Sequence, residues 1–308
     1  MAHALENVRD CEILRTHPGL AFRSENYSYS IRREGNASIY TVTDGKAAIT
    51  VPIAWAFGLG AAGQTYVFER DGSFYESRVS FYKAINGLDL TMGATSKPPA
   101  NLAEAAGRKM DAADVRDCFG CHSTGIVNGS SPVGAKGSQP QLDTLVPGVH
   151  CEACHGSAKQ HADSMRNGRG HPVAMQRLSA LSTEDLSNLC GSCHRTWAQI
   201  AANGPRGILN VRFQPYRLAN SKCYDVEDKR IACTACHDPH SHSVQEAALY
   251  DGKCAACHSA ARTGVKRCPV GTRDCVTCHM PKVELPGAHF AFTDHQIRIA
   301  GKSEAYPN

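Results

Sequence analysis

A Cys-x-x-Cys-His pattern occurs six times between residues 118 and 279 of this 308-residue chain. Two thiols three positions apart can add to the two vinyl groups of one haem, and the His that follows then binds the iron as an axial ligand. The sequence therefore predicts six covalently bound haem c groups, attached through 12 of the 15 cysteines. The copies are Cys118-Cys121-His122, Cys151-Cys154-His155, Cys190-Cys193-His194, Cys233-Cys236-His237, Cys254-Cys257-His258 and Cys275-Cys278-His279.

Zinc sites are the main alternative for such cysteines. Zinc ribbons use Cys-x-x-Cys pairs with four ligands for each ion, but they do not require a His directly after every second Cys. A thioredoxin-like redox motif occurs singly, in a βαβ setting. The His directly after every second Cys therefore favours haem.

Three cysteines lie outside the motifs. Cys223 and Cys268 flank the fourth and fifth motifs, where they either close a disulfide or remain two buried thiols. Cys11 has no evident partner and is expected to pack as a small apolar group. Haem is attached to thiols outside the cytoplasmic membrane, so we expect a periplasmic or extracellular protein, in a compartment where disulfides persist.

Nine histidines stand outside the motifs and are candidates for the second axial position. An iron with two His ligands is saturated and suited to one-electron exchange, whereas an iron with one His has an open face. Asp238 and Asp294, each beside a candidate, are expected either to orient an imidazole or to form a turn. The preferred distal ligands are His161, His240, His289 and His295, followed by His17, His171 and His3. His150 is expected in a loop or in contact with a haem propionate, and His242 on the polar surface.

Composition supports a cofactor-filled protein. Apolar residues make up 42% of the chain, which is little for a conventional core of this size. The net charge of +4 comes without a block of Lys or Arg, so nucleic acid is not an expected partner. No apolar run approaches a membrane span, and the first 26 residues lack a signal-peptide core. We therefore expect that a leader has been removed or that the N-terminus is truncated.

The first 100 residues have a different pattern from the rest. Apolar and polar residues alternate in several runs between residues 27 and 82, and Asp44-Gly45 and Asp71-Gly72 separate four of these runs. Asp-Gly between such runs is a hairpin signal, so an antiparallel meander of four to six strands is predicted. Gly58-Leu59-Gly60-Ala61-Ala62-Gly63 matches a dinucleotide motif, but the next residues favour a strand where that site needs a helix.

Residues 101–308 are expected to form the hexahaem domain, and residues 1–100 the β-rich subdomain. A helix is predicted over 102–118 and another from Ser182 into the third motif, because Ser182 and the acidic residues after it suit a helix start. Cys233, Cys254 and Cys275 are evenly spaced, which suggests repeated helix-loop units. The expected fold class is a mostly irregular and α-helical multihaem cytochrome domain with an N-terminal antiparallel β subdomain.

Several stretches resemble the multihaem cytochromes related to hydroxylamine oxidoreductase and pentahaem nitrite reductase, including bacterial multihaem proteins that sometimes carry tetratricopeptide repeats. The resemblance implies mostly bis-His haems in stacked pairs, with His161, His240 and His295 as distal ligands. Related chains usually have an earlier haem motif, absent here, so His3 would bind a haem missing from this chain or one in another subunit. The stretches are Gly148-Val149-His150-Cys151-Glu152-Ala153-Cys154-His155-Gly156, Cys236-His237-Asp238-Pro239-His240, Cys278-His279-Met280-Pro281-Lys282 and Phe292-Thr293-Asp294-His295.

Three functions remain open at this point. About 30 residues per haem cannot separate the haems fully, which favours a non-catalytic electron carrier. A reductase or oxidase of a small nitrogen or sulfur compound would need one five-coordinate haem, with the spare His, Arg206, Arg212 and Tyr216 as pocket candidates. A subunit of a haem polymer or membrane-associated complex is the third. Expected partners are redox proteins, among them other multihaem cytochromes or a membrane complex, and further copies of the chain.

Overall fold

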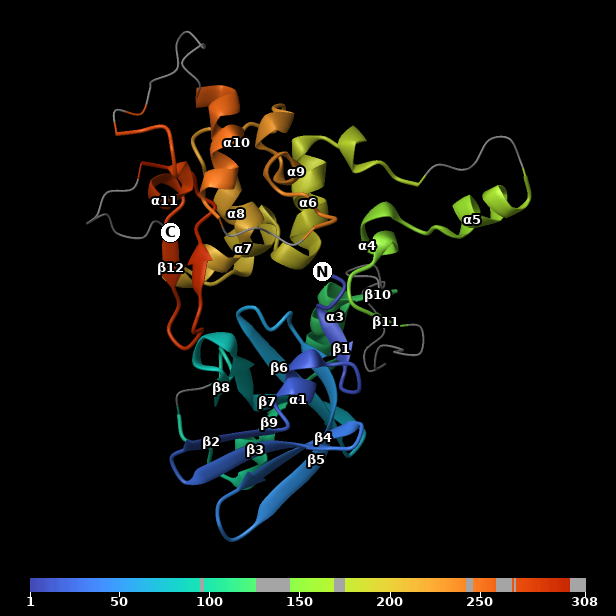
Figure 1. The fold of residues 1–308 in the computed structure, drawn as a ribbon, viewed down its shortest axis with the longest axis vertical. Helices are drawn as coiled ribbons and strands as arrows, with labels where there is room; N and C mark the ends of the chain where they lie inside the picture. Colours follow the sequence, from blue (N-terminus) through green and yellow to red (C-terminus); the bar gives the residue numbers. More distant parts are fainter. Residues whose placement is uncertain are drawn as a thin grey trace. The chain divides into compact units, whose positions relative to one another are not determined.

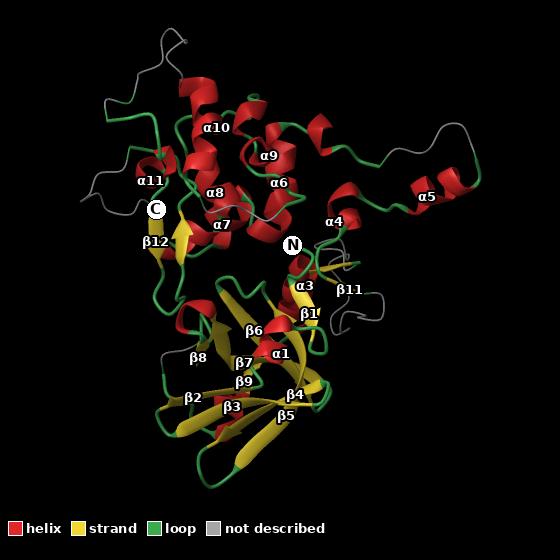
Figure 2. Ribbon diagram, in the orientation of Figure 1, coloured by secondary structure: helices red, strands yellow, loops and turns green. Residues whose placement is uncertain are grey.

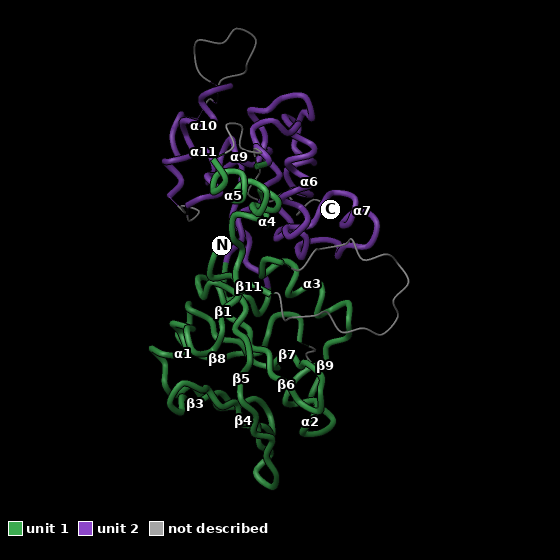
Figure 3. The backbone as a smooth tube through the Cα atoms, turned by 90° about the vertical axis from the view of Figure 1, so that its right-hand side faces the viewer, with its two compact units in different colours: residues 1–175, 286–290 green, residues 176–285, 291–308 purple. Residues whose placement is uncertain are grey.

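A computed structural model describes residues 1–94, 97–125, 145–168, 175–241, 246–258, 268 and 270–299. The chain divides into two compact units, coloured green and purple in Figure 3. Unit 1 comprises residues 1–175 and 286–290, and unit 2 comprises residues 176–285 and 291–308. The first two motifs lie in unit 1 and the other four in unit 2. The domain boundary expected near residue 100 stays a prediction.

Unit 1 contains a nine-stranded antiparallel sheet in which β2 to β8 follow one another in sequence order (Figures 1 and 2). Strand β1 pairs with β5, and β9 pairs with β7. The meander thus has more strands than the four to six predicted, because β2 and β8 lie outside the alternating runs of residues 27–82. The strands are β1 (Leu5–Asn7), β2 (Gly19–Ser24), β3 (Tyr27–Glu34), β4 (Ala37–Thr43), β5 (Ala48–Phe57), β6 (Gly63–Arg70), β7 (Ser73–Tyr82), β8 (Gly87–Leu90) and β9 (Gly107–Lys109).

The alternating residues fill the core of this sheet. Tyr29 and Ile31 of β3 are buried opposite Val42 and Tyr40 of β4, their register partners. Successive side chains of a strand point to opposite faces, so this alternation puts one face of each strand into the core. Cys11, just before α1 (Glu12–Thr16), is buried in the same cluster, as predicted, and its Sγ donates to Oε1 of Gln64 at 3.0 Å.

The hairpin between β6 and β7 turns at Asp71-Gly72, where the sequence predicts it. Both residues have positive φ, 51° and 67°, as a two-residue type I′ turn requires. The glycine motif between β5 and β6 is likewise followed by a strand rather than a helix, so it lacks the helix start that a dinucleotide site needs.

The helix predicted over 102–118 is wrong in part, because the chain forms α2 (Leu102–Ala106), β9 and then α3 (Ala112–His122). Gly107 runs so close to β7 that an added Cβ would lie 2.2 Å from the carbonyl oxygen of Glu76. A new helix begins after Asp111, whose side chain accepts from the N–H groups of Ala113 and Asp114. Strand pairing therefore overrides the helical propensity of this segment.

Beyond α3, unit 1 has only short elements among the residues that the structure describes. Strands β10 (Ser123–Thr124) and β11 (Val146–Pro147) pair, and α4 (Cys151–His155) and α5 (Lys159–Arg166) follow. Earlier in the same unit, a 3-10 helix spans Lys83–Ile85, between β7 and β8. Most of the long loop expected over 125–149 lies outside the described residues.

Unit 2 is built from short helices and one small sheet, in which β12 (Lys282–Glu284) pairs with β13 (Ala291–Thr293). The helix predicted from Ser182 is confirmed: the Ser182 side chain accepts from the N–H of Asp185 and caps α6. No helix in the described parts of the chain is long and apolar enough to cross a membrane. The helices are α6 (Thr183–His194), α7 (Trp197–Asn203), α8 (Gln214–Ala219), α9 (Cys233–Cys236), α10 (Ala248–His258) and α11 (Cys275–His279), with 3-10 helices at Leu178–Ala180, Gly207–Arg212 and Lys229–Ile231.

Candidate haem-binding sites

Each Cys-x-x-Cys-His motif lies on the last turn of a helix. Helices α3, α4, α6, α10 and α11 all end at the motif His, and His237 directly follows α9. Residues three apart on a helix share one side, so the two thiols of each motif face a common partner. All 12 motif thiols are free of disulfides. This arrangement fits covalent attachment of one haem to each motif.

The first motif is anchored in the core of unit 1. His122 donates from Nδ1 to the carbonyl oxygen of Ala4 at 2.8 Å, and its ring packs edge-on to Phe57. Burial lowers the pKa of His122, so that the imidazole is neutral near pH 7. With the proton held on Nδ1, the lone pair of Nε2 is available to a metal.

The last motif has the same hydrogen bond. His279 donates from Nδ1 to the carbonyl oxygen of Arg298 at 2.9 Å. The N–H of Arg298 in turn donates to the carbonyl oxygen of His279 at 3.2 Å, so the two residues form a closed pair. A backbone acceptor on Nδ1 fixes both the tautomer and the ring orientation of a metal-binding His.

His295, predicted as a distal ligand, lies beside the proximal residue of the fourth motif. Its Nδ1 donates to the carbonyl oxygen of Thr293 at 3.0 Å, and its ring centroid lies 6.0 Å from that of His237. Two imidazoles on opposite sides of one metal, each with a metal–nitrogen bond of about 2 Å, have a similar separation. Burial lowers the pKa of His295 to about 4, and the nearby His237 and His194 add to this shift.

The four motifs of unit 2 lie next to one another. The thiols of Cys190 and Cys233 are hydrogen-bonded, which raises the pKa of Cys190. The thiols of Cys254 and Cys275 are also hydrogen-bonded to each other. Cys254 also lies near enough to raise the pKa of Cys236, although burial is the larger cause. The third to sixth motifs therefore form a continuous series.

The helices that carry these motifs bury little of their own surface. None of α9, α10 and α11 contains a buried residue, and Leu249 on α10 is 58% exposed. Short helices gain most of their stability from packing of an apolar face. A large apolar group held by the motif thiols would supply that packing, so the residues present fit haem.

Arg212 gives a second indication that the residues present fit haem. Its Nε is buried without a hydrogen-bond partner, and burial, with a smaller contribution from Arg195, lowers its pKa. A partly buried cation is stabilised by an anion within reach. Haem carries two propionate carboxylates, which would satisfy such a group.

The other predicted distal ligands have varied surroundings. Both ring nitrogens of His17 lie within hydrogen-bond distance of a partner, Nδ1 of the Ile13 carbonyl and Nε2 of Asn86 Oδ1. His289 uses Nε2 in a 2.7 Å contact with Oδ2 of Asp89. Each imidazole would have to give up a hydrogen bond to bind iron, so neither enters our proposed ligand set.

Three further candidates are exposed or only partly buried. His3 is 69% exposed and contacts Glu6 through Nδ1 at 3.1 Å, while His240 is 76% exposed beside Asp238. His161 is partly buried on α5. His150 contacts the Pro147 carbonyl through Nε2, which agrees with its expected loop role. His171 and His242 lie outside the described residues.

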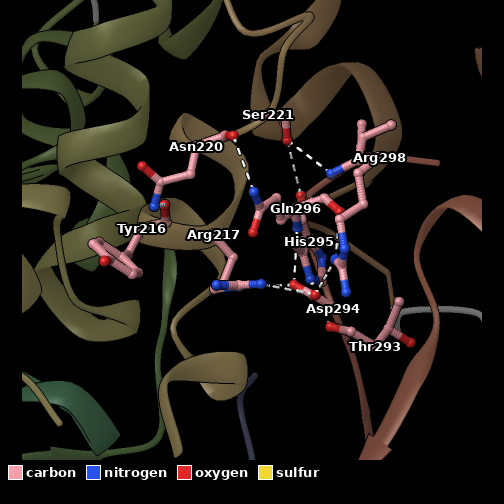
Figure 4. A network of polar contacts seen from close by, with 10 residues as sticks. Tyr216, Arg217, Asn220, Ser221, Thr293, Asp294, His295, Gln296 and Arg298 are labelled. Atoms are coloured by element: carbon pink, nitrogen blue, oxygen red, sulfur yellow. Dashed lines mark hydrogen bonds and ion pairs between the residues drawn. The ribbon is translucent and has the colours of Figure 1, made fainter. Parts of the chain in front are cut away.

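Asp294 takes the second of the two roles expected of it, because its Oδ1 accepts from the N–H of Gln296 and so forms a turn. Its carboxylate binds Arg217 and Arg298, and the acceptor for the His295 imidazole is the carbonyl of Thr293 instead (Figure 4). Arg217 was not predicted from the sequence as part of the site, because none of the residues next to it in sequence indicates that it is buried. The structure also leaves Cys223 and Cys268 as free, exposed thiols, so the possible disulfide is not formed.

Two of the pocket groups considered for an enzyme have contacts of their own. Arg206 is exposed and donates to the carbonyl oxygen of Ala201, and the Tyr216 ring is tilted against that of Trp197, with the centroids 6.5 Å apart. Among the described residues there is no group of three or more His, Cys, Asp or Glu side chains placed to hold a metal ion by themselves.

Comparisons with known proteins agree with the motif chemistry. Residues 81–156, which include the first two motifs, match the family described as cytochrome c554 and c-prime. The chain is also similar to the multiheme cytochrome MtrA of Shewanella baltica, with 26% identity over 124 residues. That match covers 39% of this chain and 36% of the relative, so the chain spans about a third of the curated relative's length. No solved structure matches significantly.

The six motifs, the backbone acceptors on the motif imidazoles and the two matches agree on one class. The chain is a multihaem c-type cytochrome.

Proposed function

We propose that the chain is an electron carrier that holds six haem c groups, one on each motif. The observation that carries this proposal is the series of adjacent motifs in unit 2, where the thiols of Cys190 and Cys233 are in contact. When bound, haem supplies an iron that takes up and releases one electron. Attachment points this close together would bring successive redox centres within reach of one another.

The protein's own contribution is to hold the motif imidazoles in fixed orientations. His122 and His279 present Nε2 because backbone carbonyls of Ala4 and Arg298 accept from Nδ1. We propose His295 as the distal ligand opposite His237, on the 6.0 Å separation of their rings. Two axial imidazoles keep the coordination unchanged between oxidation states, which suits a carrier rather than an enzyme.

Location and partners follow from the cofactor. Covalent haem attachment supports a periplasmic or extracellular protein, and the similarity to MtrA supports other multihaem cytochromes or a membrane complex as redox partners. The relationship to the hydroxylamine oxidoreductase and pentahaem nitrite reductase group, indicated by Cys236-His237-Asp238-Pro239-His240 and similar stretches, is part of the same proposal.

A haem count tests the proposal directly. The protein, matured in a host that attaches haem c, is measured by pyridine haemochrome assay and by intact mass. We expect six haems per chain, and five in a Cys254→Ser/Cys257→Ser variant. Electron paramagnetic resonance of the ferric protein should show low-spin signals only. Zinc in place of iron, or a high-spin signal that responds to added ligands, would contradict the electron-carrier proposal.

A further inference from the structure

We infer that a buried ion network positions the imidazoles bound to two different haems. The network consists of Arg217, Asp294 and Arg298, and it is defined here as the Asp294 network. It fixes the segment 293–298, whose carbonyl groups accept from Nδ1 of both His295 and His279. This inference rests on the proposed function, because it takes both imidazoles as iron ligands.

The network is buried at its centre. The side chains of Arg217 and Asp294 are both fully buried. Arg217 donates from Nε to Oδ1 of Asp294 at 2.8 Å and from Nη2 to Oδ2 at 2.9 Å, and Arg298 donates to Oδ2 as well. Such a bidentate pair fixes the relative orientation of the two groups as well as their distance. Helix α8, which carries Arg217, is thereby joined to the segment after β13.

The backbone of the segment is held on two sides, and Figure 4 shows the side formed by Ser221. Ser221, just beyond α8, accepts from the N–H of Ile297 at 2.8 Å and donates to the carbonyl oxygen of His295 at 3.3 Å. On the other side, the N–H of Asp294 donates to the carbonyl oxygen of Pro281 at 2.9 Å. The segment therefore connects α8 with the residues that follow the sixth motif.

Two imidazoles take their orientation from this one segment. Thr293 supplies the acceptor for His295, and Arg298 supplies the acceptor for His279. Asp294 lies next to Thr293 in sequence and binds the side chain of Arg298, so a change at its carboxylate displaces both acceptors together. The strength of the bond from Nδ1 controls how basic an axial imidazole is, and hence the potential of its iron. Asp294 is thus a positioning residue for two redox centres.

The test compares three variants of the mature holoprotein. Asp294→Asn keeps an acceptor for the N–H of Gln296 but weakens the bonds to both arginines. Arg217→Lys keeps the positive charge and loses the bidentate geometry. Asp228→Asn is the matched control, because Asp228 pairs with Arg230 in the same unit, is partly exposed and lies outside the segment 293–298. The readouts are the low-spin electron paramagnetic resonance signals and the midpoint potentials from spectroelectrochemical titration.

We expect Asp294→Asn to shift the signals and potentials of two haems, with the haem count unchanged. Arg217→Lys should shift the same two by a smaller amount, and Asp228→Asn should shift none. If Asp294→Asn does not fold, Arg217→Lys carries the test alone. Wild-type signals in every folded network variant, or a shift confined to one haem, would overturn the inference. A wild-type protein without haem would instead overturn the proposed function.

Discussion

The imidazole of His295 lies with its ring centroid 6.0 Å from that of His237, the motif residue that follows α9. The two residues are distant in sequence, and the Asp294 network holds the segment that carries His295. The juxtaposition therefore depends on tertiary contacts made by Asp294, the residue before His295.

Replacing His295 should remove one axial ligand. We expect His295→Ala to convert one haem from low-spin to high-spin in the ferric protein, while the other haems keep their spectra. Electron paramagnetic resonance and the high-spin absorption band measure this change. The matched control is His17→Ala, because both nitrogens of His17 already have partners. A high-spin signal in the His17 variant, or none in the His295 variant, would refute this ligand assignment.

Phe119, inside the first motif, should matter for the stability of unit 1. It is fully buried, and its ring contacts Trp55, Phe57 and Phe74 with centroid separations of 5.0 to 5.9 Å. We expect Phe119→Ala to lower the free energy of unfolding by about 3–5 kcal/mol, through lost burial and the cavity left behind. Denaturant unfolding measures this loss.

The equivalent position of the sixth motif provides the control for Phe119. Val276→Ala should cost much less, because α11 contains no buried residue. Equal losses at the two positions would show that the first motif is not anchored in the core as its contacts indicate.

The attachment residues and many local elements were predictable because they depend on short-range spacing. Asp71-Gly72 predicts the hairpin in which it lies, and Ser182 predicts the start of α6. Each of them acts on the backbone within a few residues. The split of the predicted 102–118 helix was not predictable, because it depends on the close approach of Gly107 to β7. The local sequence pattern gives no information on the pairing of β9 with β7.

The distal ligands show the same limit. His295 and His17 were both candidate distal ligands, yet one lies beside a motif imidazole and the other is held by Asn86. Arg217 carries no local sign of burial, although it is the partner that fixes Asp294. Contacts between residues distant in sequence decide these roles, so they required the structure.

The cap of α3 should contribute a pH-dependent stability. The N–H groups of Asp114 and Ala113 donate to Asp111 and lower the pKa of its carboxyl. Because the folded pKa is below the unfolded value of about 3.9, this stabilisation is complete above that value and is lost as pH falls through the folded pKa. Asp111→Asn keeps the cap but does not titrate, so the variant should lose less stability than wild type between about pH 6 and about pH 3.

Denaturant midpoints at the two pH values measure that difference, and the comparison between proteins removes the titration of all other groups. Asp10→Asn provides a control, since Asp10 is exposed and lies near the start of α1, where no side chain caps the helix. Identical pH dependence in wild type and Asp111→Asn would refute the contribution of the cap.

The three cysteines outside the motifs should differ in their reactivity towards iodoacetamide. Cys11 is fully buried, and burial raises the pKa of its thiol to about 11. At pH 8 only about one Cys11 thiol in a thousand would be a thiolate, the reactive form. Cys223 and Cys268 are exposed, and N–H groups of Val270 and Gly271 lower the pKa of Cys268.

We therefore expect two labels per native holoprotein, with Cys268 reacting before Cys223. Although Cys223 is exposed, partial desolvation of its thiol raises its pKa. Denaturation should add a third label at Cys11, and Cys11→Ser should abolish only that addition. Peptide mass spectrometry identifies each site. Labelling of Cys223 and Cys268 only after reduction would mean that they form a disulfide in the mature protein, and rapid native labelling of Cys11 would contradict its burial in the core of the sheet.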